Sequence, residues 1–214
     1  GTSFEVGDRM SLYVVEYTGE DVAKLQVAGN YINNEPMLYD GVQWKGVRPL
    51  FWSKTHCDFY GVYPYQEPQT VTNYLFDIVT DQNSPEVDGQ LSGYEASDLM
   101  WAKAEKIKPP YTTYTDDDGT VCTPPIAEDH YYPVQMQFKH MMSRVVVKLE
   151  RGEKYEGELP EDLTIYAMGS WAYSEGIMGK KISVSDLKVN DRITVFSDMD
   201  GNPITLNVGK TYIA

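Results

Sequence analysis

The stretch FKHMMSRVVVKL, residues 138–149, changes the parity of its apolar positions halfway along its length. Up to Met142 the apolar face is even-numbered and includes His140, whereas from Val145 onward the apolar positions are odd-numbered. Alternation with a period of two is typical of a β-strand that buries one face. One extra residue near Met141–Ser143 lets both halves bury their apolar side chains, so we predict one long strand with a β-bulge.

His140 is the candidate functional residue of this stretch. A lone histidine on an apolar face is more often a packed, hydrogen-bonded residue of the core or of an interface than a catalytic one, and a bulge frees backbone groups that it can bind. Ser143 cannot complete a catalytic triad with it, because the two side chains point to opposite faces of a strand. His56 and His130 also have no second histidine at metal-ligand spacing. We therefore expect an architectural His140 and predict no catalytic residue.

Alternation of apolar and polar residues recurs from end to end of the chain, which predicts an all-β fold. The first strand, before and after a turn at Gly7-Asp8, carries one apolar face: Phe4, Val6, Met10, Leu12 and Val14. Asp40-Gly41 between two short apolar flanks predicts a tight hairpin. Further strands are expected at residues 57–65, 74–82, 163–168, 192–196 and 203–208, with a hairpin turn at 197–202 between the last two.

Residues 97–108, SDLMWAKAEKIK, are the best candidate for a helix. The AKAEK run has high helix propensity, and Ser97 is a suitable N-cap. Leu99 and Trp101 nevertheless alternate as they do in a strand. We expect an extended piece over Asp98–Ala102 with one helical turn.

The chain has 214 residues, with 18 Lys+Arg against 32 Asp+Glu and a net charge of −14. This charge repels nucleic acid and anionic lipid, so we expect neither as a partner. No run of 18 apolar residues is present, which argues against a membrane-spanning helix. The start at Gly1 is typical of a processed or trimmed form, and we expect any export signal or lipid attachment to lie upstream.

Two acidic stretches invite a calcium interpretation, and a turn explains each more simply. Residues 198–202, DMDGN, open like an EF-hand loop, but position twelve is Gly209 instead of the required Glu. Asp116–Asp118 either bind a cation or form a solvated turn. Cys57 and Cys122 have no metal-ligand spacing and form either a disulfide or two free thiols. We predict no metal and no cofactor.

Aromatic side chains supply a further candidate site. The set comprises Trp44, Trp52, Tyr60, Tyr65, Trp101, Tyr111, Tyr114, Tyr131 and Tyr132. Tryptophan and tyrosine serve in sandwich cores as well as at contact surfaces. These residues are therefore either ordinary packing or a contact platform for carbohydrate or protein.

Five motifs occur in order along the first part of the chain: FEVGDRM at 4–10, DFYGVYPY at 58–65, DQ at 81–82, SDLMWA at 97–102 and FKHMMSRV at 138–145. Together they resemble the fimbrillin-like family of Bacteroidales, which contains fimbrial subunits also called type V pilins. The resemblance implies two transthyretin-like β-sandwich domains in tandem, exported as a lipoprotein to the outer membrane. It also implies that an Arg-specific protease removes an N-terminal segment with one strand, and that a strand of the next subunit fills the groove so opened.

The resemblance leads to a set of functional expectations. We predict a fimbrillin-like β-sandwich over residues 1–150 and a short C-terminal β domain over 151–214, divided at the charged stretch 151–162. The expected role is a non-catalytic fimbrial subunit or fimbria-associated adhesin at the cell surface, with other fimbrial subunits as partners by strand addition. The alternative is a non-polymerising surface lipoprotein that binds a host protein or glycan through loop aromatics. An open hydrophobic groove or a long unpaired sheet edge is expected beside the Phe4–Val15 strand.

Overall fold

The computed structural model describes residues 3–68, 70–71, 73–76, 78–79, 82, 84–87, 89–110, 114–115, 118–122, 133–142, 144, 146–148, 150, 152–157, 166–169, 172–175, 182–184, 191–194 and 211–213. The chain divides into two compact units, each built from separate stretches. Unit 1 contains residues 1, 72–100 and 140–214, and unit 2 contains residues 2–71 and 101–139. The expected domains are instead two continuous ranges that meet at residue 150, and this division stays a prediction.

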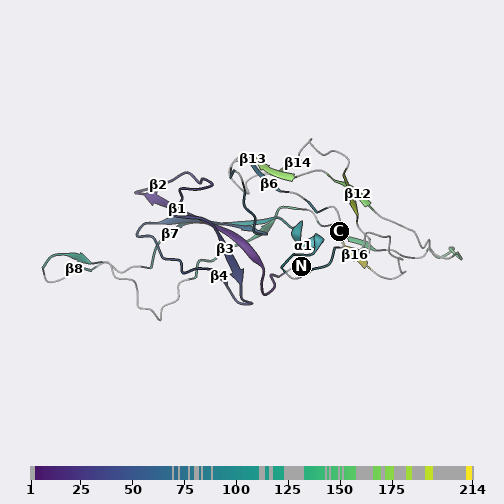
Figure 1. The fold of residues 1–214 in the computed structure, drawn as a ribbon, viewed down its shortest axis with the longest axis horizontal. Coiled ribbons are helices and arrows are strands. Elements are labelled where there is room, and N and C mark those ends of the chain that lie inside the picture. Colours follow the sequence, from purple (N-terminus) through teal and green to yellow (C-terminus); the bar gives the residue numbers. More distant parts are fainter. Residues whose placement is uncertain are drawn as a thin grey trace. The chain divides into compact units, whose positions relative to one another are not determined.

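Unit 2 is organised around an antiparallel sheet in which β1 (Arg9–Thr18) is a central strand (Figure 1). β1 pairs on one side with β3 (Ile32–Tyr39) and on the other with β5 (Cys57–Tyr63). The strand order is β10–β7–β5–β1–β3–β4, and β2 pairs with the end of β1. The remaining bounds are β2 (Asp21–Val22), β4 (Trp44–Gly46), β7 (Met100–Ile107) and β10 (Lys139–His140), with a separate hairpin of β8 (Tyr114–Thr115) and β9 (Val121–Cys122).

The sequence of β1 explains its central position. Every residue from Ser11 to Val15 is buried, as expected of a strand that is covered on both faces. Met10, Leu12 and Val14 are buried on the predicted apolar face. Val6 does not share this face and is 76% exposed, because the chain turns at Gly7, which has φ +100°. That part of the predicted face was wrong.

The predicted Asp-Gly hairpin joins β3 to β4. Asp40 Oδ1 accepts hydrogen bonds from the backbone N–H groups of Val42 (2.9 Å) and Gln43 (2.8 Å). Gly41 has φ +97°, a conformation that other residues adopt only with strain. Tyr39 pairs with Trp44 across the hairpin, which places both aromatic side chains on one face of the sheet.

The described residues of unit 1 form three small antiparallel sheets. In the largest, β13 (Ala172–Glu175) lies between β6 (Asn73–Phe76) and β14 (Ile182–Val184), so strands distant in sequence are paired. The two others are β12 (Tyr166–Gly169) with β15 (Asp191–Thr194), and β11 (Val146–Lys148) with β16 (Thr211–Ile213). Strands were expected near β6, β12 and β15, whereas residues 197–208 lie outside the described part of the chain.

The stretch 138–149 does not form the single bulged strand that its alternation predicts. β10 ends at His140 at the margin of the large sheet, whereas β11 begins at Val146 and pairs with β16 in a different sheet. The parity change therefore marks a change of partner strand. Alternation reports which positions are buried and cannot distinguish a bulge from a change of sheet.

The helix candidate at residues 97–108 is mostly strand. β7 buries Met100, Ala102 and Ala104 at alternate positions, and this burial outweighs the helix propensity of the AKAEK run. The helical turn lies upstream in α1 (Gly93–Ala96), where Ser92 and Glu95 form a capping box. Ser97 is therefore the C-cap and not the predicted N-cap. Within the described residues no helix is long and apolar enough to cross a lipid bilayer.

Candidate functional site

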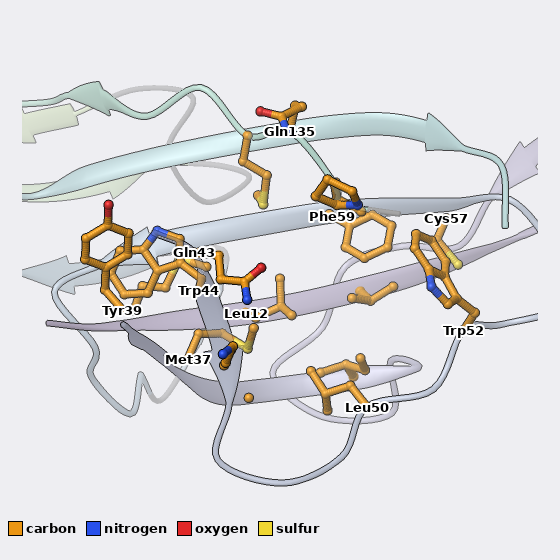
Figure 2. A pocket seen from close by; sticks show the side chains of 18 of the residues that line it. Leu12, Met37, Tyr39, Gln43, Trp44, Leu50, Trp52, Cys57, Phe59 and Gln135 are labelled. Carbon is orange, nitrogen blue, oxygen red and sulfur yellow. The ribbon is translucent and has the colours of Figure 1, made fainter. Parts of the chain in front are cut away.

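A cavity of about 730 Å³ lies on one face of the unit 2 sheet (Figure 2). Its floor is formed by the even-numbered side chains of β1, joined by Ile32 and Met37 of β3. Met10, Leu12 and Val14 are each at most 5% exposed, so the floor is part of the folded core. We call this cavity the β1 groove.

Aromatic side chains form one end of the β1 groove. The ring of Phe4 lies edge-on to Trp44, with centroids 4.9 Å apart, and to Phe138, with centroids 5.3 Å apart. Tyr39 stacks beside Trp44 at 5.2 Å, as its pairing across the hairpin requires. Such edge-to-face clusters are rigid and apolar, so this end is a preformed wall.

A second aromatic pair stands at the other end of the groove, where Trp52 and Phe59 lie edge-to-face with centroids 5.7 Å apart (Figure 2). The neighbouring Cys57 is a buried free thiol, and burial raises its pKa. A thiol held protonated by burial is unreactive, so Cys57 behaves as a small apolar residue of the lining.

The rim of the groove exposes apolar side chains to solvent. Val42 is 86% exposed and Phe51 is 77% exposed, although both line the cavity. Lys45 on the rim pairs with Asp40 at 2.7 Å, and this hydrogen bond, with those from the turn, holds the pKa of Asp40 well below its usual range. Large exposed apolar side chains beside a groove mark an interaction surface.

Arg48 is the other cation of the rim. Its Nε donates to Glu35 Oε2 at 2.8 Å, and the Glu35 carboxylate is buried beneath it. Within the described residues, no group of three or more His, Cys, Asp or Glu side chains is placed to hold a metal ion. The groove offers apolar contact area with a charged border and is suited to binding an apolar partner segment.

Residues 1–207 match the model of the family described as fimbrillin-like. The chain belongs to the fimbrillin-like family. A curated relative, named as the fimbrium tip subunit Fim1C of Bacteroides ovatus, is 29% identical over 151 residues, 69% of this chain and 24% of the relative. The chain therefore spans about a quarter of that relative's length.

Two solved structures from Bacteroides ovatus ATCC 8483 resemble this fimbrillin-like chain. One is described as a cell adhesion protein and has a TM-score of 0.59 at 14% identity. The match covers 100% of this chain and 69% of that one. The other, described as a fimbrial protein, has a TM-score of 0.43 at 18% identity, with 99% of this chain and 39% of that one covered. The first likeness supports the nearly all-β fold.

In this fimbrillin-like chain, His140 is exposed to solvent and does not lie on an apolar face. Its side chain is 52% exposed, and Nδ1 lies 2.8 Å from Asp98 Oδ1. The prediction of a packed histidine was wrong, while the predicted hydrogen bond is present with a carboxylate as its partner. The apolar face ends at Phe138, since β10 begins at the sheet margin. Ser143 and His130 lie outside the described residues.

The other sequence candidates have mixed outcomes. Asp118 Oδ1 accepts from the backbone N–H of Thr120 at 2.9 Å, which is a turn contact, whereas Asp116 lies outside the described residues, as does 198–202. Cys57 is a free thiol, so the disulfide alternative does not hold for it.

The aromatic candidates are distributed over several surroundings. Trp44 and Trp52 are half-buried walls of the β1 groove, and Tyr60 is buried. Tyr65 and Trp101 are half-buried outside the groove lining, while Tyr111, Tyr131 and Tyr132, with the side chain of Tyr114, lie outside the described part. Packing therefore explains the described members better than an exposed platform does.

The expectation of a groove beside the first strand fits the β1 groove, whereas the alternative of an unpaired edge does not, because β3 and β5 flank β1. Sequence reasoning found the floor through the alternation of β1. It missed Leu50 and Phe51, which lie in an irregular segment without any periodic signal.

Proposed function

We propose that this chain is part of a fimbrial subunit or fimbria-associated adhesin, and that its β1 groove receives an extended segment of another fimbrial subunit. The observation that carries the proposal is the open apolar groove within a fimbrillin-like chain. The proposal includes a non-catalytic role, because the described side chains of the groove supply mainly apolar contact area.

Burial of apolar surface supplies the driving force in this proposal. Val42 and Phe51 project from the rim, and each buried side chain of this size is worth about 1.5–3 kcal/mol. Among the described strands β4 stands at the end of the sheet order, and we propose that an added strand lies along it. Backbone pairing at β4 and alternate side chains entering the groove together describe strand addition.

The proposal also includes the cellular location of the protein and its division into domains. We place the mature protein at the cell surface in a fimbria, attached to the outer membrane through an upstream lipid anchor. A transthyretin-like sandwich over residues 1–150 and a short C-terminal β domain over residues 151–214 remain our proposal for the division into domains.

The test is site-specific photo-crosslinking in cells that produce the full-length protein. A benzophenone amino acid at Phe51 should give a covalent adduct with another fimbrial subunit, identified by mass spectrometry, because Phe51 lies on the groove rim. The matched control is Val121, which is 64% exposed and lies outside the groove lining. Equal adduct yields at both positions, or none at Phe51, would contradict the proposal.

The alternative function is binding of a host protein or glycan by a non-polymerising surface lipoprotein. Trp44 and Trp52 favour it, because aromatic walls suit both apolar segments and sugar faces. The same experiment separates the two functions, since an adduct at Phe51 with a host molecule and none with a subunit would support the alternative.

A further inference from the structure

One wall of the β1 groove is a segment of the chain that belongs to no strand. Residues 133–138, PVQMQF, run along the cavity directly before β10, and we call them the strap. The even-numbered Val134, Met136 and Phe138 are half-buried, whereas the odd-numbered residues are exposed. Pro133 and Gln135 also line the cavity, but the more buried side chains of the strap are the alternate apolar ones, as in an added strand.

The strap is held by side chains. An added Cβ on Gly61 would lie 2.8 Å from Phe138 Cζ and 3.2 Å from Met136 Cε, so both side chains rest directly on the backbone of β5. The Phe138 ring also contacts Phe4. Among the described residues, no backbone hydrogen bond outside the strands involves residues 133–138.

The strap fills the groove incompletely. A cavity of about 730 Å³ remains beneath it, and its inward side chains stay half-buried, unlike the almost fully buried floor. A segment that makes ladder hydrogen bonds as well as apolar contacts has an advantage over one that makes apolar contacts alone.

We propose that the strap is an intramolecular occupant of the β1 groove and leaves it when an extended segment of another subunit enters. This inference rests on the proposed function, because it takes the groove to be the binding site for such a segment. It adds that the free subunit covers part of its own groove, and that the entering segment carries apolar residues at alternate positions, as the strap does. An entering segment binds only those molecules in which the strap is displaced. Its apparent affinity is therefore the intrinsic affinity of the open groove multiplied by the fraction of such molecules.

The test measures binding of a labelled synthetic peptide of sequence PVQMQF to the purified 214-residue chain by fluorescence anisotropy. The strap-release variant Met136→Ser/Phe138→Ser should bind the peptide at least about tenfold more tightly than the parent, as expected if the strap covers the groove in at least nine molecules of ten. The matched control Gln137→Ser changes an exposed residue of the same segment that does not line the groove, and it should bind like the parent.

A second variant guards against misfolding of the first. The single variant Met136→Ser keeps Phe138 and its contact with Phe4, so it disturbs the fold less and should still bind the peptide more tightly than the parent, by less than the double variant. Equal or weaker binding by both variants, or no binding by any form, would show that the strap is a permanent wall and overturn the inference. Tighter peptide binding without any subunit adduct at Phe51 would show that the strap can be displaced but that no subunit occupies the groove, which would refute the proposed function.

Discussion

The even-numbered side chains of β1 line the groove, whereas its odd-numbered side chains, Ser11, Tyr13, Val15 and Tyr17, lie on the opposite face of the same strand. Ser11, Tyr13 and Val15 are as deeply buried as the groove floor. The opposite face, however, also buries a charged group, and we call it the polar face: Asp58 of β5, opposite Val15 in the register, is 1% exposed there.

Asp58 organises the polar face through three contacts. Its Oδ1 accepts from the hydroxyl of Tyr17 and from the backbone N–H of Lys106, each at 2.8 Å, and its Oδ2 lies 3.2 Å from Lys103 Nζ. Lys103 Nζ also lies 5.0 Å from the centre of the Tyr60 ring. Burial lowers the pKa of Lys103, but hydrogen bonds to Glu105, Tyr60 and Asp58 outweigh it and raise that pKa overall.

The two faces differ in how much change they tolerate. Apolar contacts in the groove are non-directional and can be exchanged for those of a partner. The contacts of Asp58 depend on direction and charge, and a missing member leaves a buried group unpaired. One strand thus combines a face that fixes the fold with the face that, in our proposal, receives another segment.

Removal of the Asp58 carboxylate should have the largest effect on stability. We expect Asp58→Ala to lower the free energy of unfolding by about 3 kcal/mol, the lower end for a broken buried ion pair, because Lys103 keeps some solvent contact. Urea unfolding at pH 7 measures the change. The double variant Asp58→Leu/Lys103→Met removes both charges and should recover part of the loss; a loss below about 1 kcal/mol for Asp58→Ala would show that the polar face does not fix the fold.

The fold was predictable where alternation decides the burial of a strand. Met10, Leu12 and Val14 occupy alternate positions of one strand, and Asp40-Gly41 is a strong signal for a tight turn, so β1 and the β3–β4 hairpin follow from local sequence. The pairing of β6 with β13 joins residues about a hundred positions apart, and no local pattern carries that information.

The site was predictable only in part, for a related reason. The floor of the groove follows from β1, but Phe51 reaches the rim from an irregular segment. Asp58 was overlooked because, in sequence, a carboxylate inside DFYGVYPY looks like an exposed strand residue; its partners Tyr17 and Lys103 come from two other strands. His140 was misplaced because its own strand ends where the alternation continues.

A substitution at Gly61 tests the groove face in the comparison of the two faces. Gly61→Ala should lower the free energy of unfolding by about 1–2 kcal/mol, because the new methyl group displaces Phe138 and Met136, which are half-buried and can move. Thermal and urea unfolding measure it. In a double-mutant cycle with Phe138→Ala the two losses should not add, since the displaced ring is already absent. Additive losses would mean that the ring does not rest on Gly61.

Tyr17→Phe tests the polar face with the smallest change, the removal of one hydroxyl. Burial and the hydrogen bond to Asp58 raise the pKa of Tyr17 from 10.0 to about 12. Because the folded pKa lies above the unfolded one, the protonated hydroxyl stabilises the fold fully below pH 10 and this contribution is lost as the pH rises through about 12. The variant should therefore be less stable than the parent at pH 7, by less than about 1 kcal/mol, and the difference should shrink between pH 10 and 12. Phenylalanine keeps the ring that lies 6.0 Å from Lys106 Nζ, so the readout isolates the hydroxyl. Paired urea titrations across this range measure the difference, and a constant gap would show that the hydroxyl does not bind Asp58 in solution.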